Sequence, residues 1–164
     1  MISEIENVRN IANNLSVTNL EKDLECEEYS GYNFHLDNFP VKFRKAKVTP
    51  KKVGLFVTLW KRNNKKQTEP FHENDHFQFY IISVQEETNF GFFLFSKQIL
   101  TDQKILSSQK AVGKRGFRVY PNWVQTNNKQ AEKTQSWQRN YFISLADNRS
   151  ENTEKINRIL AGNY

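Results

Sequence analysis

Phe77-Gln78-Phe79-Tyr80-Ile81-Ile82-Ser83-Val84 is the stretch that decides the fold of this chain. It is long and almost continuously apolar, which is typical of a central strand buried on both faces of a sheet. Leu55–Trp60 is the clearest strand of the sequence, and Gly91–Phe95 supplies a further one soon after the first stretch. Together these runs predict a β-sheet at the centre of the molecule.

Shorter strands are expected around these runs. Residues 34–36 and 41–43 alternate apolar and polar side chains, at the period of two that a half-buried strand requires. Residues 117–120 form a short strand that ends at Pro121, and residues 141–145 return to the strand pattern.

Helices are expected before, between and after these strands. Apolar residues at three-to-four spacing predict an N-terminal helix over residues 2–24. The residues that form this pattern are Ile2, Ile5, Val8, Ile11, Ala12 and Leu15. The sequence also predicts a short helix over 97–109, a helix over 129–139, where the composition is helix-forming, and a last helix over 150–161.

This order of elements predicts a single α+β domain over residues 1–164, with one central sheet that is mixed, largely antiparallel and flanked by helices. A length of 164 residues fits one domain, and a 13% share of aromatic residues supplies large side chains for its core. The single cysteine, Cys26, excludes a disulfide scaffold and an all-cysteine zinc site.

The sequence shows neither a membrane-spanning run nor the pattern of a signal peptide. No apolar run approaches the roughly 20 residues that span a bilayer. The N-terminal stretch Met1–Asn10 is acidic and lacks the basic-then-apolar layout of a signal peptide. We therefore expect a cytoplasmic protein with no membrane partner.

The net charge of +6 is distributed in blocks. Residues 40–66 carry 10 basic and no acidic side chains, and residues 103–139 carry 8 basic and 1 acidic. Residues 1–39 carry 8 acidic and 2 basic side chains, and residues 67–102 carry 6 acidic and 1 basic. If the two basic blocks meet in the fold, they form a positive face suited to phosphate backbones.

Basic, amide and aromatic side chains are interleaved within the two basic blocks. Lys and Arg pair with phosphates, Gln reaches base edges, and Trp and Tyr offer faces for stacked bases. The glycines that flank Lys114-Arg115 predict backbone N–H groups close to an anion. We therefore expect a protein that binds nucleic acid, DNA or RNA, in a basic groove lined by aromatic residues. The candidate contact residues are Arg44, Lys45, Lys47, Thr49, Lys51, Lys61, Arg62, Lys114, Arg115, Arg118, Tyr120, Gln130, Lys133, Gln135, Trp137 and Gln138.

Each of these features also has a plainer interpretation. Alternating Lys and Arg on a strand can be its solvated face, and Trp60 and Trp137 can be core residues because an indole buries so much area. The segment 113–116 can be no more than a hairpin turn. A different hypothesis for the function is a protein-interaction module whose acidic blocks bind a basic partner.

His72-Glu73-Asn74-Asp75-His76 matches the zinc-protease pattern H-E-x-x-H. In that pattern the two histidines lie one helical turn apart, so that both reach one metal ion. Here Pro70 stands two residues before the motif, and a strand is expected from Phe77, which leaves no room for the helix. We interpret the motif as a polar loop and expect no metal site there.

The alternative to binding without catalysis is a metal-dependent nuclease, or a nucleotide-processing enzyme, with a degenerate active site. Such enzymes gather carboxylates around Mg²⁺, with a lysine nearby. The strand that leads to Lys61 carries Leu59 at the position where an acid is needed, so this pattern is incomplete. If the chain is an enzyme, Glu28 and Asp75 are the candidate catalytic residues and Mg²⁺ is the cofactor. Otherwise we expect no cofactor.

Several blocks of the sequence together form a family pattern, and they are Glu28-Tyr29, Gly31, Phe34, Phe43–Lys47, Thr49-Pro50, Gly54–Arg62, Pro70-Phe71, Asp75, Gly113–Pro121, Trp123, Gln130-Ala131, Lys133–Gln135, Trp137-Gln138 and Tyr141-Phe142. In these blocks the chain resembles the MepB-like protein family. The resemblance runs from about Glu25 to Leu145, so that residues 25–145 are the family-like core. The turn Asn63–Lys66 and the pair His72-Glu73 depart from the family pattern.

The resemblance implies a bacterial cytoplasmic protein, because members of the family are such proteins and some are encoded beside a multidrug efflux pump and its regulator. It implies a fold similar to the DNA-binding, substrate-handling parts of restriction endonucleases. It therefore points to nucleic acid, as the charge pattern does, but it supplies no catalytic residues.

Overall fold

The computed structural model describes residues 3–11 and 15–162 as an α+β fold built on a six-stranded sheet. The sheet has the strand order β1-β2-β3-β8-β9-β11. These strands are Val17–Lys22 (β1), Tyr32–Leu36 (β2), Phe39–Lys45 (β3), Phe79–Glu86 (β8), Asn89–Ser96 (β9) and Phe142–Ser144 (β11). All neighbouring pairs are antiparallel except β3 and β8, which run parallel. The expected mixed, largely antiparallel sheet is confirmed.

Strand β8 lies at the centre of this sheet, as its apolar sequence predicts. Every residue from Phe79 to Val84 is buried. On one side Ile81 pairs with Phe43 of β3, and on the other side it pairs with Leu94 of β9. Because β8 has partners along both edges and is buried on both faces, almost every position takes an apolar side chain.

Two smaller sheets accompany the main one, which the sequence did not predict. One contains β10 (Gly116–Val119), β5 (Leu55–Thr58) and β4 (Lys47–Val48), and the other contains β6 (Trp60–Arg62) and β7 (Thr68–Pro70). The run expected as one strand over Leu55–Trp60 is thus shared between two sheets. Leu59 lies between the two parts. Up to Thr58 the chain pairs with β10, and from Trp60 onward it pairs with β7.

The prediction of an N-terminal helix over residues 2–24 is wrong. Helix α1 covers Ser3–Ile11, where Ile5 and Val8 are buried as expected, whereas residues 17–22 form β1. The register between β1 and β2 shifts between Thr18 and Glu21, and Asn19 there has a φ of 54°. This left-handed conformation ends any helical path, and asparagine tolerates it better than most residues. Ile2 and Ala12 of the expected pattern lie outside the described residues.

The later helices agree better with the sequence. Helix α3 (Lys129–Gln138), which continues into the 3-10 turn η2 (Arg139–Tyr141), and helix α4 (Arg149–Leu160) lie close to their predicted positions. Helix α2 covers only Lys97–Asp102 of the expected 97–109, because Lys104 adopts a φ of 58° and turns the chain away. A further 3-10 segment, η1 (Leu24–Tyr29), precedes β2.

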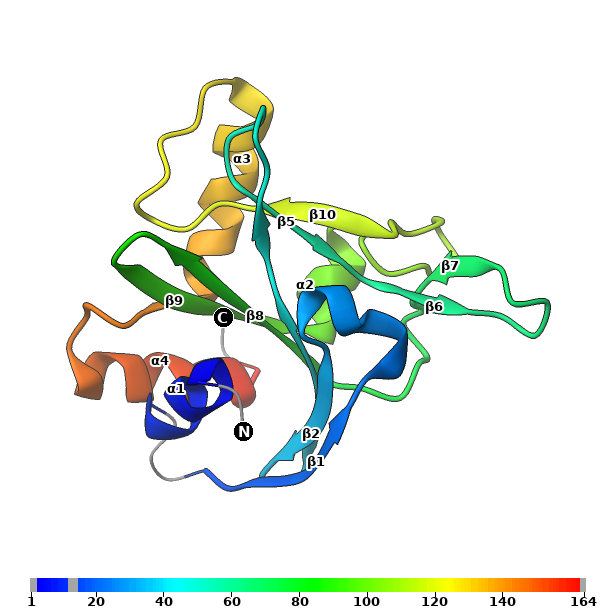
Figure 1. Cartoon of the computed structure of the whole chain (residues 1–164), viewed down its shortest axis with the longest axis horizontal. Coiled ribbons are helices and arrows are strands. Elements are labelled where there is room, and N and C mark those ends of the chain that lie inside the picture. The colour runs from blue at the N-terminus through cyan, green and yellow to red at the C-terminus, as the bar shows by residue number, and fades with distance from the viewer. Residues whose placement is uncertain (1–2, 12–14, 163–164) are drawn as a thin grey trace.

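The helices lie at different ends of the molecule (Figure 1). Helices α1 and α4 pack side by side near the main sheet, and α4 contacts β9 and β11. Helix α3 lies at the other end, against β10. Strands β6 and β7 form a hairpin that projects from the side. Across residues 3–11 and 15–162, no helix is long and apolar enough to cross a membrane.

Candidate nucleic-acid interface

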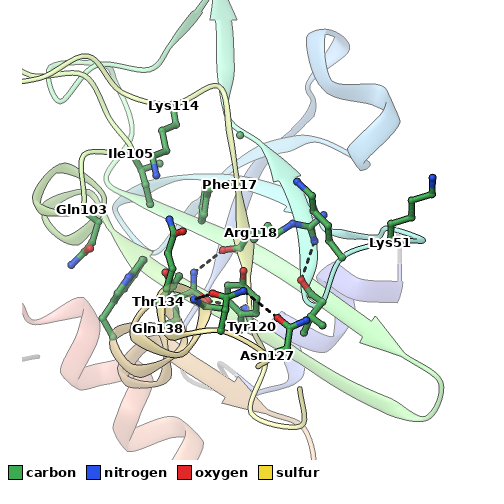
Figure 2. A pocket seen from close by; sticks show the side chains of 17 residues that line it. Lys51, Gln103, Ile105, Lys114, Phe117, Arg118, Tyr120, Asn127, Thr134 and Gln138 are labelled. Carbon is green, nitrogen blue, oxygen red and sulfur yellow. Dashed lines mark hydrogen bonds between the residues drawn. The ribbon is translucent and has the colours of Figure 1, made fainter. Parts of the chain in front are cut away.

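A cavity of about 520 Å³ opens between β10, α3, the turn at residues 51–53 and the segment at residues 103–105. We call it the basic pocket because Lys51, Lys52, Lys114 and Arg118 are among its lining residues. No Asp or Glu belongs to the described residues that line it. Figure 2 shows Lys114 and Lys51 on separate sides of the pocket, with Arg118 between them and Tyr120, Thr134 and Gln138 below. The two basic blocks of the sequence therefore meet at this cavity.

Aromatic side chains also line the basic pocket. Trp137 is half-buried and packs against Phe95 and Tyr141, with ring centroids 5.3 Å and 6.4 Å away. Phe117 and Tyr120 are almost fully buried, at 8% and 9% exposure. Trp137 therefore serves the core and also lines the cavity.

Arg118 holds the turn that carries Lys51 and Lys52. Its Nη1 donates to the carbonyl oxygens of Val53 and Gly54 at 3.2 Å each, and its Nη2 donates to Thr49 Oγ1 at 2.6 Å. Arg118 therefore positions this turn as well as adding a charge to the pocket. Thr49, a candidate contact residue, uses its hydroxyl to accept this bond.

The same turn packs tightly against Tyr120 at Gly54. Gly54 has a φ of 85°, and a Cβ atom there would lie 2.7 Å from the Tyr120 ring. Only glycine fits both the left-handed conformation and this close approach.

Two glutamines of α3 that were expected to contact nucleic acid are structural instead. Gln138 is fully buried, and Gln135 is 5% exposed. Gln135 Nε2 donates to the carbonyl oxygens of Pro121 and Val124, so it holds the loop that follows β10. Gln138 bonds to backbone groups of β10 and of Tyr120 next to it. Neither amide is free to reach a base edge.

Arg44 is the clearest correction among the candidate cations. Its side chain is 1% exposed, and its Nη2 forms a 2.5 Å ion pair with Asp23. A guanidinium buried in this way cannot reach a phosphate from outside. Its neighbour Lys45 is paired with Glu4 at 2.5 Å and lies on the same strand, β3.

Lys61 is also neutralised, and by the acid that was considered for catalysis. Its Nζ lies 2.7 Å from Asp75 and 3.7 Å from Glu69. Asp75 also accepts the backbone N–H of His72 at 2.7 Å. Burial raises the pKa of Asp75, but the His72 N–H and the Lys61 ammonium outweigh it and hold the pKa below the ordinary value of 3.8.

Glu28, the other candidate acid, is exposed in η1. The H-E-x-x-H stretch forms turns before β8 rather than a helix, with the Asp75 N–H donating to the His72 carbonyl. Over the described ranges, no group of three or more His, Cys, Asp or Glu side chains could hold a metal ion.

The remaining candidates lie outside the basic pocket. Lys47 lies over the Tyr29 ring at 4.5 Å, and Arg62 lies over the Trp60 ring at 5.2 Å. Arg115 donates to the backbone and hydroxyl oxygens of Thr68 on β7, and so joins the β6–β7 hairpin to the start of β10. Lys133 is exposed on α3. The candidates that line the pocket are Lys51, Lys114, Arg118, Tyr120, Gln130, Trp137 and Gln138.

The backbone N–H groups of Gly113 and Lys114 are bonded within the protein, so these two are not free for the anion that the sequence predicted there. The Gly113 N–H donates to Ser107 Oγ at 2.8 Å, and the Lys114 N–H donates to the Ile105 carbonyl at 2.9 Å. A Cβ atom at residue 113 would lie 2.4 Å from that carbonyl oxygen. Glycine is therefore required at residue 113 for close packing, and Lys114 and Gly116 are the residues of the segment 113–116 that line the pocket.

The list of candidate contact residues lacks five polar residues that line the pocket, which are Lys52, Gln103, Asn127, Asn128 and Thr134. Gln103 follows α2, and Asn127 lies just before Asn128, the N-cap of α3 whose side chain accepts from the Ala131 N–H. The asparagine pair at 127–128 was a usable signal for the start of that helix. Nothing in the local sequence around Gln103 indicates that it faces a cavity.

The chain is similar to known proteins both in sequence and in fold. Residues 23–144 match the family described as MepB-like. The fold is similar to the crystal structure of MepB, with a TM-score of 0.80 and 31% identity, covering 90% of this chain and 100% of that chain. A bacterial homing endonuclease, I-Ssp6803I, matches with a TM-score of 0.45 and 14% identity, covering 80% of this chain and 82% of that chain, and this likeness carries no functional argument. No curated protein matches the sequence.

Proposed function

This chain belongs to the MepB-like family, and we propose that it binds nucleic acid at the basic pocket. The observation that supports this most strongly is how the acidic side chains are distributed around the cations. Acids neutralise Arg44, Lys45 and Lys61 on β3 and β6. Within the described chain, none of the pocket's Lys51, Lys52, Lys114 and Arg118 forms an ion pair with a carboxylate.

Unpaired cations that converge on a cavity favour a polyanionic ligand. Because no acid offsets them, their fields add and attract phosphate groups. Each phosphate that they neutralise releases counterions from the nucleic acid, which drives binding at low salt. Trp137, with part of its ring exposed, adds a surface on which a base can stack. A nucleic-acid ligand also fits the cytoplasmic location that we propose for this protein.

Fluorescence anisotropy with labelled single-stranded and duplex DNA and RNA tests this proposal. We expect log K to fall with log salt by about 0.9 per phosphate contacted on duplex DNA and about 0.7 on single strands. Lys114→Gln and the double variant Lys51→Gln/Lys52→Gln should weaken binding and flatten this slope. Arg118 is left unchanged because it also holds a turn in place.

Arg158→Gln is the matched control because it removes one positive charge from an exposed position on α4, away from the pocket. It should leave affinity and slope close to those of the wild type. A binding constant that does not change with salt, or an equal loss in the Arg158→Gln variant, would overturn the proposal.

The catalytic alternative is tested in the same samples by adding Mg²⁺ or Mn²⁺. We expect the labelled strands to stay intact, because the carboxylate of Asp75 is already engaged by Lys61 and by the His72 N–H. Metal-dependent cleavage that Asp75→Asn or Glu28→Gln abolishes would replace binding by a nuclease activity.

A further inference from the structure

We propose that the basic pocket receives one unpaired nucleotide, so that the ligand is single-stranded nucleic acid or a frayed end rather than intact duplex. This inference rests on the proposed function and names the form of its ligand.

The size of the pocket suits a single nucleotide. A volume of about 520 Å³ falls within the range of about 300–1,000 Å³ that is usual for small-molecule sites. Its walls come from four separate segments, the turn at 51–53, residues 103–105, β10 and α3. A duplex keeps its bases stacked and paired inside, so only an extruded or unpaired nucleotide can enter such a cavity.

The lining combines cations with apolar and aromatic side chains. Ile105 and Phe117 are buried, at 3% and 8% exposure, and they line the same cavity as Lys114. Contact with the phosphates of a duplex needs only positive charge at the surface. The partly exposed Trp137 in this mostly polar lining instead offers a face to a flat, weakly hydrated group such as a nucleobase, while the cations fit its phosphate.

Polar side chains in the pocket are available to a ligand. Within the described residues, the side chains of Gln103, Gln130 and Thr134 form no hydrogen bond to the rest of the protein, although all three line the cavity. Amide and hydroxyl groups of this kind can bond the exposed edge of an unpaired base. Gln130 also lies in the first turn of α3, where the helix dipole favours a negative group.

Competition binding tests whether a nucleotide enters. The probes are a labelled oligodeoxyadenylate, the same strand annealed to its complement, adenosine 5′-monophosphate, adenosine and inorganic phosphate. We expect the single strand to bind about tenfold more tightly than the duplex, which is the scale of one stacked base. Adenosine 5′-monophosphate should displace the single strand, and phosphate or adenosine alone should be much weaker competitors.

A pocket-filling variant tests the location. Thr134→Phe places a ring in the cavity and should reduce the preference for the single strand to about twofold or less, while duplex binding through surface cations persists. Ser136→Phe is the matched control, because Ser136 is exposed on the same helix and does not line the basic pocket. Gln130→Trp, at an exposed position of the pocket, serves as the second variant if Thr134→Phe lowers the melting temperature.

The outcomes separate this inference from the proposed function. Equal affinity for single strand and duplex, with both sensitive to salt and to Lys114→Gln, would overturn the inference and leave the proposed function intact. Displacement by inorganic phosphate as effective as that by adenosine 5′-monophosphate would reduce the pocket to a phosphate site and also overturn the inference. No binding to any strand would overturn both.

Discussion

Gln138 is hydrogen-bonded to the backbone of Tyr120, and this contact joins α3 to the end of β10. Gln138 Oε1 accepts the Tyr120 N–H at 2.8 Å, and Nε2 of the same amide donates to the Arg118 carbonyl at 2.9 Å. The side chain is fully buried. Because α3 and β10 form two walls of the basic pocket, this amide helps to fix the relative position of the walls.

Replacing Gln138 should therefore loosen the pocket and destabilise the fold. Gln138→Met keeps the length of the side chain but leaves the Tyr120 N–H and the Arg118 carbonyl buried without partners. We expect the free energy of unfolding to fall by about 1–3 kcal/mol for each unsatisfied group. Urea denaturation measures this, with Gln130→Met on the exposed face of the same helix as the control. A loss no larger than that of the control would show that the two bonds contribute little.

The buried pair of Arg44 and Asp23 should matter for stability and not for binding. Arg44→Met leaves the Asp23 carboxylate, which is 13% exposed, without its 2.5 Å partner. Breaking one partner of such a pair costs about 3–5 kcal/mol, and Arg44→Met/Asp23→Asn should recover part of that loss. Denaturation measures the loss. The affinity of the folded fraction for nucleic acid, measured by anisotropy, should match that of the wild type. A loss of affinity without a loss of stability would mean that Arg44 contributes to binding.

Asp75 should contribute a stability that disappears in acid. Its pKa in the folded protein lies below the ordinary value of 3.8, because the His72 N–H and Lys61 outweigh the effect of burial. A group whose folded pKa is depressed stabilises the protein above its unfolded pKa, and this contribution is lost as pH falls through the folded pKa. We therefore expect Asp75→Asn to be less stable than the wild type at neutral pH.

The difference between Asp75→Asn and the wild type should shrink as the pH falls below about 4. Denaturation at a series of pH values measures this difference. The control is Asp102→Asn at an exposed position at the end of α2, which should give a small difference. If the difference in the free energy of unfolding between the wild type and Asp75→Asn stays the same from neutral to strongly acidic pH, the assigned ionisation is contradicted.

Gly113 should not tolerate even the smallest side chain. In Gly113→Ala the new Cβ would lie 2.4 Å from the Ile105 carbonyl oxygen and 2.6 Å from the Ser107 nitrogen, and both are backbone atoms that cannot rotate away. Overpacking of this kind costs about 1–3 kcal/mol. The melting temperature measures it, with Val112→Ala next door as the control because Val112 is 83% exposed. An unchanged melting temperature would mean that the loop at 107–113 shifts freely.

The main sheet was largely predictable from the sequence. Because β8 is buried on both faces, nearly every residue of Phe79–Val84 is apolar. An alternation of apolar and polar residues indicates β2 and β3. The strand β1 was mistaken for helix because the helix indicated by the apolar spacing from Ile2 to Leu15 was extended to residue 24. This segment forms a strand because it pairs with β2, and that pairing cannot be read from the local sequence.

The candidate site was only half predictable. The segregation of charge along the sequence placed Lys51, Lys114 and Arg118 among the binding candidates, and these residues do line one cavity. The sequence gives no sign, however, that Gln135 and Gln138 turn inward to bond the backbone. Their direction depends on which face of α3 packs against β10, because residues three apart on a helix share a face.

By itself, the sequence determined the α+β class, the central strand and two segments rich in cations. The tertiary structure decided which of those cations remain without an acidic partner. Arg44 meets Asp23 across 21 positions of the sequence, and Lys45 meets Glu4 across 41. An ion pair depends on a separation of a few ångströms, and segments so far apart in sequence reach that separation only when the chain has folded.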